Sequence, residues 1–287
     1  MIPLDEKTKK TGRRMSYIVL CAAVALVTVL FGVRVSYPLG VYYALVIVQL
    51  TVICLPGWKL GAWAVRAESE ERRRLATAGS LLVIPWGLFS FLTGFSAPQL
   101  ATNPENQLRY LILMINTLAV AGGLIVLWHT LSVARERFYS TLGFASIVLA
   151  GPLYFIFTAV QLVLYRTMDR TGVGEATNIL RSLDELAVIF LYFGVVLTYL
   201  ATALFAAAIG RLQWLGRTAR RVFVGLSLFA IMCVLIKMAE IFSSPHNPMW
   251  GFETWYMIPG FVFSIPAVPW MMPCLVGIVL LHRAGEA

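Results

Sequence analysis

Charged residues are scarce in this sequence. Only 13% of its 287 residues are Asp, Glu, Lys or Arg, whereas 59% are hydrophobic and the mean hydropathy is +0.80. Soluble domains carry roughly one quarter charged residues, and a chain this apolar lacks the polar surface needed to cover a water-soluble globule. The shortage of charge therefore argues against that class of protein.

The motifs of several enzyme classes are also missing. The sequence contains no nucleotide-binding loop, no Asp-rich diphosphate motif, no His-Glu-x-x-His and no Gly-x-Ser-x-Gly. Kinase, ATPase, zinc-peptidase and serine-hydrolase chemistry therefore have no support. The four cysteines lack metal-ligand spacing, and the three histidines fall on different sides or at different levels of the expected fold. We therefore expect no metal and no redox cofactor.

Long apolar runs determine the fold class. A helix of about 20 mostly apolar residues crosses a bilayer, and the sequence contains eight windows of this kind. They cover residues 15–35, 38–57, 78–97, 108–132, 139–165, 182–209, 217–242 and 257–281. Because the windows leave no room for a soluble domain, we predict a single all-α integral membrane domain over residues 1–287 with eight transmembrane helices. The membrane itself, endoplasmic reticulum or plasma membrane, is left open.

The charges that are present favour one orientation. We place residues 1–14, 58–77, 133–138 and 210–221 and the C-terminus on one side, where they hold 17 of the 23 Lys and Arg residues and a net charge of +10. The other side then has a net charge of −1. Because basic residues accumulate on the cytoplasmic side of membrane proteins, we expect both termini to be cytoplasmic. An even number of crossings also requires both termini to lie on the same side.

Two of these basic segments have a more specific interpretation. Residues 1–14 form a basic tail, and residues 58–77 form an amphipathic connector that faces lipid headgroups. Arg217, Arg220 and Arg221 are the same kind of anchor before the seventh window. The formal net charge of +9 therefore indicates orientation and contact with membrane lipids, and we do not expect nucleic acid as a partner.

Ionisable residues inside the apolar windows mark the candidate site, because such residues are costly in a bilayer. Lys237 and Glu240 lie three residues apart, so they share one face of the seventh helix. Asp184 lies near the start of the sixth helix, and Glu253 lies just before the eighth. Structural roles stay open, since Lys237 and Glu240 could pair with each other and Glu253 could be an ordinary loop residue.

The start of the sixth helix has a structural interpretation of its own. Ser182 and Glu185 fit a capping box, in which the Glu185 side chain reaches back to the amide of Ser182. On this interpretation the helix begins at Ser182. Asp184 is then the freer of the two neighbouring carboxylates.

Aromatic residues occur at the same level of the expected fold. The candidates for a pocket wall are Trp86, Tyr154, Trp270 and Trp250. Plain packing or an interfacial aromatic belt is the alternative. Aromatic faces stabilise cations, and an apolar environment favours a neutral carboxyl group that can donate a proton. Such a pocket suits a carbocation cyclisation, and its shape would also serve to bind a lipid.

Prolines and amides inside the windows give two further expectations. Four prolines interrupt the last window: Pro259, Pro266, Pro269 and Pro273. Irregular backbone in a bilayer needs protein or a polar cavity around it, so we expect this segment to line the site. Three amides lie within windows: Gln49, Asn116 and Gln161. We expect them to form hydrogen bonds between helices.

Two stretches near the C-terminus resemble a known family. The segments Leu235-Ile-Lys-Met-Ala-Glu240 and Trp250-Gly-Phe-Glu253-Thr-Trp-Tyr256 are similar to the last two helices of the fungal lipid-translocating exporter family. That family has a basic residue, a nearby acid, a Gly-containing outer loop, a second acid and an aromatic residue. The resemblance implies that Lys237, Glu240 and Glu253 act in lipid or amphiphile transport. Lys stands here in place of that family's Arg, and its next intramembrane Asp is absent.

In size, number of expected spans and outer cluster of acids, the chain also resembles the integral membrane terpene cyclases of fungal meroterpenoid pathways. The likeness is one of architecture, without a shared motif. It implies that membrane-embedded carboxylates protonate an epoxide or alkene on a prenyl chain during secondary metabolism. It also implies association with other membrane biosynthetic enzymes.

The leading hypothesis is therefore an isomerase-type terpene cyclase that acts on a prenylated, epoxidised amphiphile. Glu240 or Asp184 would be the general acid, and Glu253 a partner or base. Lys237 would orient the carboxylate or the departing oxyanion, and the four aromatic candidates would surround the substrate. A lipid or amphiphile exporter is the alternative, and a membrane sensor or receptor is the third hypothesis.

Overall fold

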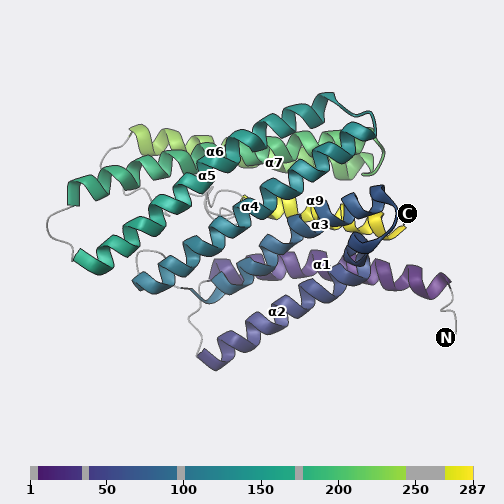
Figure 1. Cartoon of the computed structure of the whole chain (residues 1–287), viewed down its shortest axis with the longest axis horizontal. Helices are drawn as coiled ribbons and strands as arrows, with labels where there is room; N and C mark the ends of the chain where they lie inside the picture. Colours follow the sequence, from purple (N-terminus) through teal and green to yellow (C-terminus); the bar gives the residue numbers. More distant parts are fainter. Residues whose placement is uncertain (1–5, 34–38, 96–100, 172–176, 244–268, 287) are drawn as a thin grey trace.

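The computed structural model of the chain describes residues 6–33, 39–95, 101–171, 177–243 and 269–286 (Figure 1). Within these residues it contains helices and no strand, which confirms the all-α class for this part of the chain. The helices are α1 (Glu6–Val33), α2 (Leu39–Leu60), η1 (Ala62–Arg66), α3 (Glu70–Phe89), η2 (Ser90–Gly94), α4 (Asn103–Val133), α5 (Phe138–Thr171), α6 (Thr177–Arg211), α7 (Arg217–Ser243) and α9 (Met271–Glu286). The two η elements are short 3-10 helices.

Six candidate membrane spans occur in the described residues, one in each of α2 to α7, with that of α3 continuing into η2. These helices present large apolar side chains outward: Ile47, Leu118 and Val163 are 60–64% exposed. Apolar surface of this extent is covered by lipid rather than water. The chain is therefore a multi-pass membrane protein.

Helices that are neighbours in the chain mostly pack as neighbours in space. From α3 to α7 each helix packs on the next, and α1 packs on α2. The exception is α9, the last helix, which packs mainly on α3 and also contacts α1, α2 and α6 (Figure 1). Most of its residues are buried, including Met272, Ile278 and Leu281. Protein rather than lipid therefore covers most of the surface of α9.

A pair of glycines lets α9 approach α3 closely. A Cβ atom added to Gly277 would lie 2.8 Å from the carbonyl oxygen of Gly79 and 2.8 Å from the Cβ of Leu82. A Cβ added to Gly79 would lie 2.9 Å from the carbonyl oxygen of Gly277. Small residues at such crossings allow the backbones of membrane helices to pack together. Only glycine at both positions permits this separation.

A second close approach anchors the other end of α9. A Cβ added to Gly61 would lie 1.9 Å from the carbonyl oxygen of Leu281, and one added to Gly285 would lie 2.2 Å from that of Leu60. The end of α2 and the end of α9 are thus in backbone contact. Glycines 277 and 285 lie two turns apart on α9, so both contacts use one face of the helix.

Two prolines of the last window lie at the start of a helix, where proline is well tolerated. Pro269 lies in the turn before α9, and Pro273 lies in its first turn. The missing N–H of a proline costs little there, because the first N–H groups of a helix have no partner within the helix. Pro259 and Pro266 lie outside the described residues, so the expectation that this whole segment lines the site stays a prediction.

Side-chain contacts bring three of the basic segments to one end of the bundle. The Nε group of Arg72 donates a hydrogen bond to the carbonyl oxygen of Ala284 at 3.2 Å. The guanidinium of Arg283 lies over the ring of Trp214, 4.5 Å from its centroid. Residues 58–77, residues 210–221 and the last helix therefore meet, as their common charge predicted. The described start of α1 and the end of α9 lie at this end too (Figure 1).

Two tight turns at this end connect α4 to α5 and α6 to α7. In each, a non-glycine residue adopts the left-handed region: Arg135 with φ 66° and Gln213 with φ 59°. After α6, the N–H of Trp214 donates to the carbonyl of Ile209 at 3.1 Å, and that of Gln213 donates to Gly210 at 3.3 Å. This pair of bonds is a Schellman motif. It satisfies carbonyl groups that a helix end would otherwise leave unpaired.

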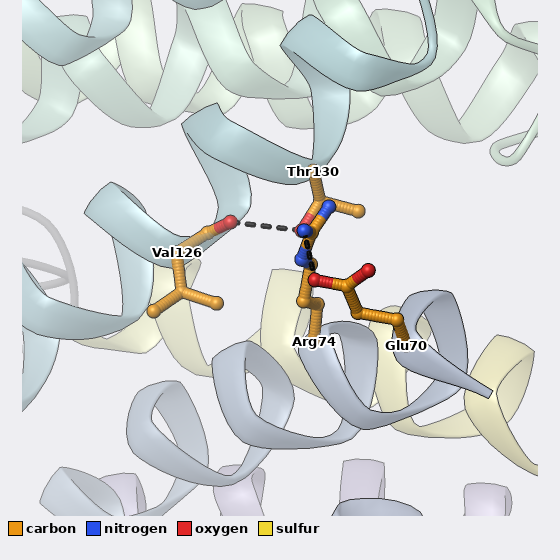
Figure 2. A network of polar contacts seen from close by, with 4 residues as sticks. All are labelled: Glu70, Arg74, Val126 and Thr130. Carbon is orange, nitrogen blue, oxygen red and sulfur yellow. Dashed lines mark hydrogen bonds and ion pairs between the residues drawn. The ribbon is translucent and has the colours of Figure 1, made fainter. Parts of the chain in front are cut away.

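Two polar interactions where α3 and α4 pack together near Glu70 form within single helices (Figure 2). Glu70 forms an ion pair with Arg74 one turn later on α3. On α4, the hydroxyl of Thr130 donates to the carbonyl of Val126 at 2.8 Å. Figure 2 shows the Arg74 guanidinium reaching toward Thr130 between the two helices. Both interactions therefore join residues one turn apart on the same helix.

The structure changes two of the expected boundaries. The connector at residues 58–77 includes the end of α2 at Leu60, then η1, and the start of α3 at Glu70. Two acids in the first turn of α3 favour a helix start there. The sixth helix begins at Thr177 rather than at Ser182. Ser182 therefore lies inside the helix, and the capping-box interpretation with Glu185 is wrong.

We expect Gly277→Ala to lower the free energy of unfolding by about 1–3 kcal/mol, the usual cost of overpacking. The thermal unfolding midpoint of the detergent-purified protein measures this effect. Gly225→Ala on α7 is the matched control, because a Cβ there has no atom within 4 Å and alanine favours helix. Equal midpoints for the two variants would contradict the close contact between α9 and α3.

Candidate functional site

The structure describes the side chains of only some of the predicted site residues. Trp250 and Glu253 lie outside the described residues, and Glu240 belongs to α7 but its side chain is outside them as well. Lys237 lies on α7, is buried with 6% exposure, and has an interaction partner. The roles predicted for these four residues stay predictions. Asp184, Trp86, Tyr154 and Trp270 can be placed directly.

Asp184 lies on α6 and is half-buried. The Nε2 group of Gln161 on α5 donates a hydrogen bond to its Oδ1 atom. This bond joins two helices, so the prediction that Gln161 bonds between helices is confirmed. Because an amide N–H occupies Oδ1, Oδ2 is the oxygen that can carry a proton in the neutral acid.

A row of aromatic side chains extends from the start of α9 toward this carboxyl group. Trp270 contacts Tyr154 of α5 with ring centroids 5.4 Å apart, and Tyr154 contacts Phe157 at 5.7 Å. Phe157 lies edge-on to Tyr110 of α4 at 5.8 Å, and Tyr110 stacks on Tyr165 at 5.6 Å. The row therefore unites α4, α5 and α9. It brings together two predicted residues, Tyr154 and Trp270.

The two ends of this aromatic row differ in their surroundings. Trp270, Tyr154 and Phe157 are each at most 2% exposed. At the other end, the Tyr110 and Tyr165 side chains share a hydrogen bond and interact electrostatically with Asp184 and Arg109. A carboxyl group and a guanidinium thus flank the tyrosine pair from α6 and α4. This arrangement places a carboxyl group near one end of the aromatic row.

Arg109 is the main residue of the cluster that the sequence interpretation missed. It is only 8% exposed, although it lies in a predicted membrane helix. It donates to the side-chain oxygen of Asn106, lies 3.8 Å from Glu105 and sits over the ring of Phe95 at 5.7 Å. Residues 105 and 106 precede Arg109 by four and three positions, so each is its neighbour on the helix surface. This spacing could have identified the three residues as a polar cluster from the sequence alone.

The tyrosine pair was also missed. Tyr110 and Tyr165 belong to different helices, and each is adjacent in the sequence to an arginine, Arg109 and Arg166. Tyr110 is 3% exposed. Their contact depends on how α4 and α5 pack, which residue spacing within one helix does not give.

Trp86 occupies a different place from the row. It is 2% exposed on α3 and stacks on Phe89 at 5.3 Å. Phe89 is its ring contact among the described aromatic residues. The indole N–H of Trp86 has no hydrogen-bond acceptor in the described part of the chain. The structure therefore does not bring Trp86 into contact with Tyr154 or Trp270. Its predicted role in shielding a cation is untested.

The two remaining amides behave differently from each other. The Nδ2 group of Asn116 on α4 donates to the carbonyl of Pro85 on α3 at 3.1 Å, which confirms a bond between helices. Gln49 is buried on α2 with 3% exposure, and neither atom of its amide has a hydrogen-bond partner in the described structure. The expected interhelical bond of Gln49 is therefore not formed.

An apolar groove of about 510 Å³ lies elsewhere, between α2, η1 and α3. Its lining includes Trp58, Trp63, Arg66 and Ser80. Trp58 and Trp63 are more than one third exposed, so the groove opens on the outer surface of the bundle. Apolar walls with an arginine at one end suit an acyl chain whose headgroup lies at the interface.

No group of three or more His, Cys, Asp or Glu side chains that could hold a metal ion occurs in the described residues. Comparison of the whole chain with protein-family models, with curated proteins and with solved structures finds no match. The functional argument therefore depends on the geometry of the carboxyl group and the aromatic row.

We expect the hydrogen bond between Gln161 and Asp184 to contribute a coupling free energy of about 0.6–1.7 kcal/mol, the range of interhelical hydrogen bonds in membranes. A double-mutant cycle of Gln161→Ala and Asp184→Ala measures it through unfolding in mixed micelles. A cycle of Gln49→Ala with Asp184→Ala is the control, because Gln49 lies on α2 and shares no partner with Asp184. Additive single effects in the first cycle would show that the bond is absent.

Proposed function

We propose that this protein is an integral membrane terpene cyclase in which Asp184 donates the initiating proton. The observation that carries the proposal is the row Tyr165, Tyr110, Phe157, Tyr154 and Trp270, which extends from the Asp184 carboxyl group into the bundle. Cyclisation of a prenyl chain requires an acid at one end and weakly basic faces along the developing cations. Aromatic rings provide such faces without capturing the cation covalently.

The proton transfer follows from the hydrogen bonding of Asp184. Gln161 donates to Oδ1, so the neutral acid presents its proton from Oδ2 to the oxygen of a terminal epoxide. The C–O bond then breaks, and the alkene electrons of the prenyl chain form new C–C bonds to the electron-poor carbon. Loss of a proton from the final cation ends the reaction. The product therefore has the mass of the substrate.

Most of the other predicted residues keep their roles within this proposal. Glu240 is the alternative proton donor, Glu253 accepts the final proton, and Lys237 orients a carboxylate or the departing oxyanion. Trp250 completes the wall around the hydrophobic substrate, and Trp86 is assigned no part in it because it packs on Phe89 apart from the row. In this scheme Gln161 is a positioning residue, because it acts on the substrate only through Asp184.

We also propose that the chain crosses the membrane eight times with both termini in the cytoplasm. The basic segments of the described structure gather at one end of the bundle, and both the start of α1 and the end of α9 lie there (Figure 1). Excess Lys and Arg favours the cytoplasmic side. This orientation puts Asp184 and the tyrosine pair toward the outer leaflet.

A lipid exporter is the second candidate, and the groove between α2 and α3 favours it. The groove is apolar, opens toward lipid and carries Arg66 and two tryptophans. An exporter would move an unaltered amphiphile from one leaflet to the other. A cyclase changes the product profile, so one assay separates the two functions.

We expect Asp184→Asn to reduce cyclisation by at least about 100-fold, because general acid catalysis contributes about 10²–10⁴-fold. Membranes containing the protein are incubated with terminally epoxidised farnesyl and geranylgeranyl phenols, and products are identified by mass spectrometry and NMR. Gln161→Leu should reduce turnover less than Asp184→Asn. The Gln161→Leu variant should leave KM little changed, because the substitution alters the position of the acid but removes no contact with the substrate.

The matched control is Glu185→Gln, which removes a neighbouring exposed carboxylate of the same helix turn. It should retain activity. An active Asp184→Asn variant together with an inactive Glu240→Gln variant would show that Glu240, and not Asp184, is the general acid. Redistribution of these amphiphiles between leaflets without a new compound of equal mass would support the exporter instead.

We expect a glycosylation acceptor inserted with a flexible spacer at residues 172–176 to be modified in microsomes. Acceptors at either terminus or after Gln213 should stay unmodified, because these positions face the cytoplasm in the proposed topology. Gel mobility with and without endoglycosidase gives the result. Modification at only one terminus would show an odd number of crossings and would contradict the proposed eight.

A further inference from the structure

Four arginines line a hollow of about 590 Å³ where α6 ends and α7 begins. They are Arg211, Arg217, Arg220 and Arg221, and the lining is completed by Gly210, Gln213, Leu215 and Gly216. Within the described part of the chain, no carboxylate forms an ion pair with any of the four arginines. The hollow lies at the opposite end of α6 from Asp184 and is separate from the candidate cyclase site.

The backbone around the hollow favours an anion. The Schellman bonds from Trp214 and Gln213 occupy the carbonyls of Ile209 and Gly210, which would otherwise present negative charge at the end of α6. On the other side, the first bond of α7 runs from the Arg220 N–H to the Gly216 carbonyl at 2.9 Å. Gly216 has no side chain to cap the helix, so the first N–H groups of α7 stay open to a ligand.

Two of the arginines are held in place by packing. A Cβ added to Gly210 would lie 2.1 Å from Cδ and 2.7 Å from Cγ of Arg220, so the Arg220 side chain crosses α6 directly over that glycine. The guanidinium of Arg211 lies over the ring of Tyr139, 5.5 Å from its centroid. Arginines positioned in this way lose less conformational freedom when they bind a ligand.

We propose that this hollow binds the headgroup of an anionic phospholipid that carries phosphate monoesters. Guanidinium groups bind phosphate through paired hydrogen bonds. Each phosphate monoester carries about −1.5 to −2 charges at pH 7, so two of them match four arginines. The hollow lies at the ends of two membrane-spanning helices, which is the level of lipid headgroups. Basic pockets at this level favour lipids of this class.

The test measures binding of dioctanoyl phosphatidylinositol bisphosphate to the full chain in detergent by thermophoresis. Arg220→Gln should weaken binding about tenfold, because it removes a positioned, charge-assisted contact. Arg73→Gln is the matched control. Arg73 is an exposed arginine on α3 outside the hollow, and its loss should change the affinity by less than about twofold.

A second pair of variants keeps the net charge constant. Gly210→Ala would displace the Arg220 side chain, and Arg220→Lys would replace paired hydrogen bonds with a single ammonium. Both should weaken binding several-fold while the protein keeps its charge. If Gly210→Ala fails to fold, Arg220→Lys still gives the result, since a lysine side chain fits the same path over Gly210.

Three results would overturn the proposal. The first is non-specific attraction. It would appear as equal affinity for the bisphosphate and for dioctanoyl phosphatidylserine, or as a loss of affinity in Arg73→Gln equal to that in Arg220→Gln. The second is binding of inositol trisphosphate as tight as that of the lipid, which would assign the hollow to a soluble phosphate. The third is the absence of saturable binding. None of these outcomes depends on the cyclase proposal, because the assay measures no turnover.

Discussion

The separation between Gly79 and Gly277 is the constraint on which the rest of the bundle depends. In a bilayer the hydrophobic effect does not drive one apolar helix onto another, so close packing must hold them together. The two glycines allow the backbones of α3 and α9 to meet. This contact makes α9 the buried centre of the described helices. It also sets the position of Trp270 at one end of α9 and of Arg283 at the other.

The two ends of the bundle use polar residues in opposite ways. At one end, Arg109 and Asp184 are drawn in among tyrosines and are partly or fully shielded from the surroundings. At the other, Arg217 and Arg221 are exposed and face the surface. Shielded charges are suited to chemistry on an apolar substrate, and exposed charges to the binding of anionic headgroups. The same helix, α6, reaches both ends.

Properties that depend on residues close in sequence were predictable. Six of the eight windows predicted from hydropathy match candidate spans in the described residues, and the shared charge of residues 58–77 and 210–221 predicted that they lie together. Gln161 and Asn116 were expected to bond between helices because an isolated amide in a bilayer needs a partner. The contact of Tyr154 with Trp270 was not specified by the spacing of either residue, and their assignment to a substrate wall stays a prediction.

Properties that depend on packing between distant helices were not predictable. The tyrosine pair forms because α4 and α5 pack in one register, and no pattern within either helix records that register. Gln49 is buried without a hydrogen-bond partner among the described residues, against the general rule for amides. The error at the start of α6 has a local cause. A Ser-x-x-Glu pattern also occurs inside helices, where Ser182 is found.

The central position of α9 has a consequence for how the protein is made. This helix leaves the ribosome after α1 to α7, yet it fills the space beside α3, α1 and α6. The pairs from α4 to α7 can assemble in the order of synthesis, while the glycine face of α3 stays without its partner. Among the described helices, α9 is therefore the last to be made, and its docking completes the packing around α3. The order of synthesis and the order of packing thus differ in this bundle.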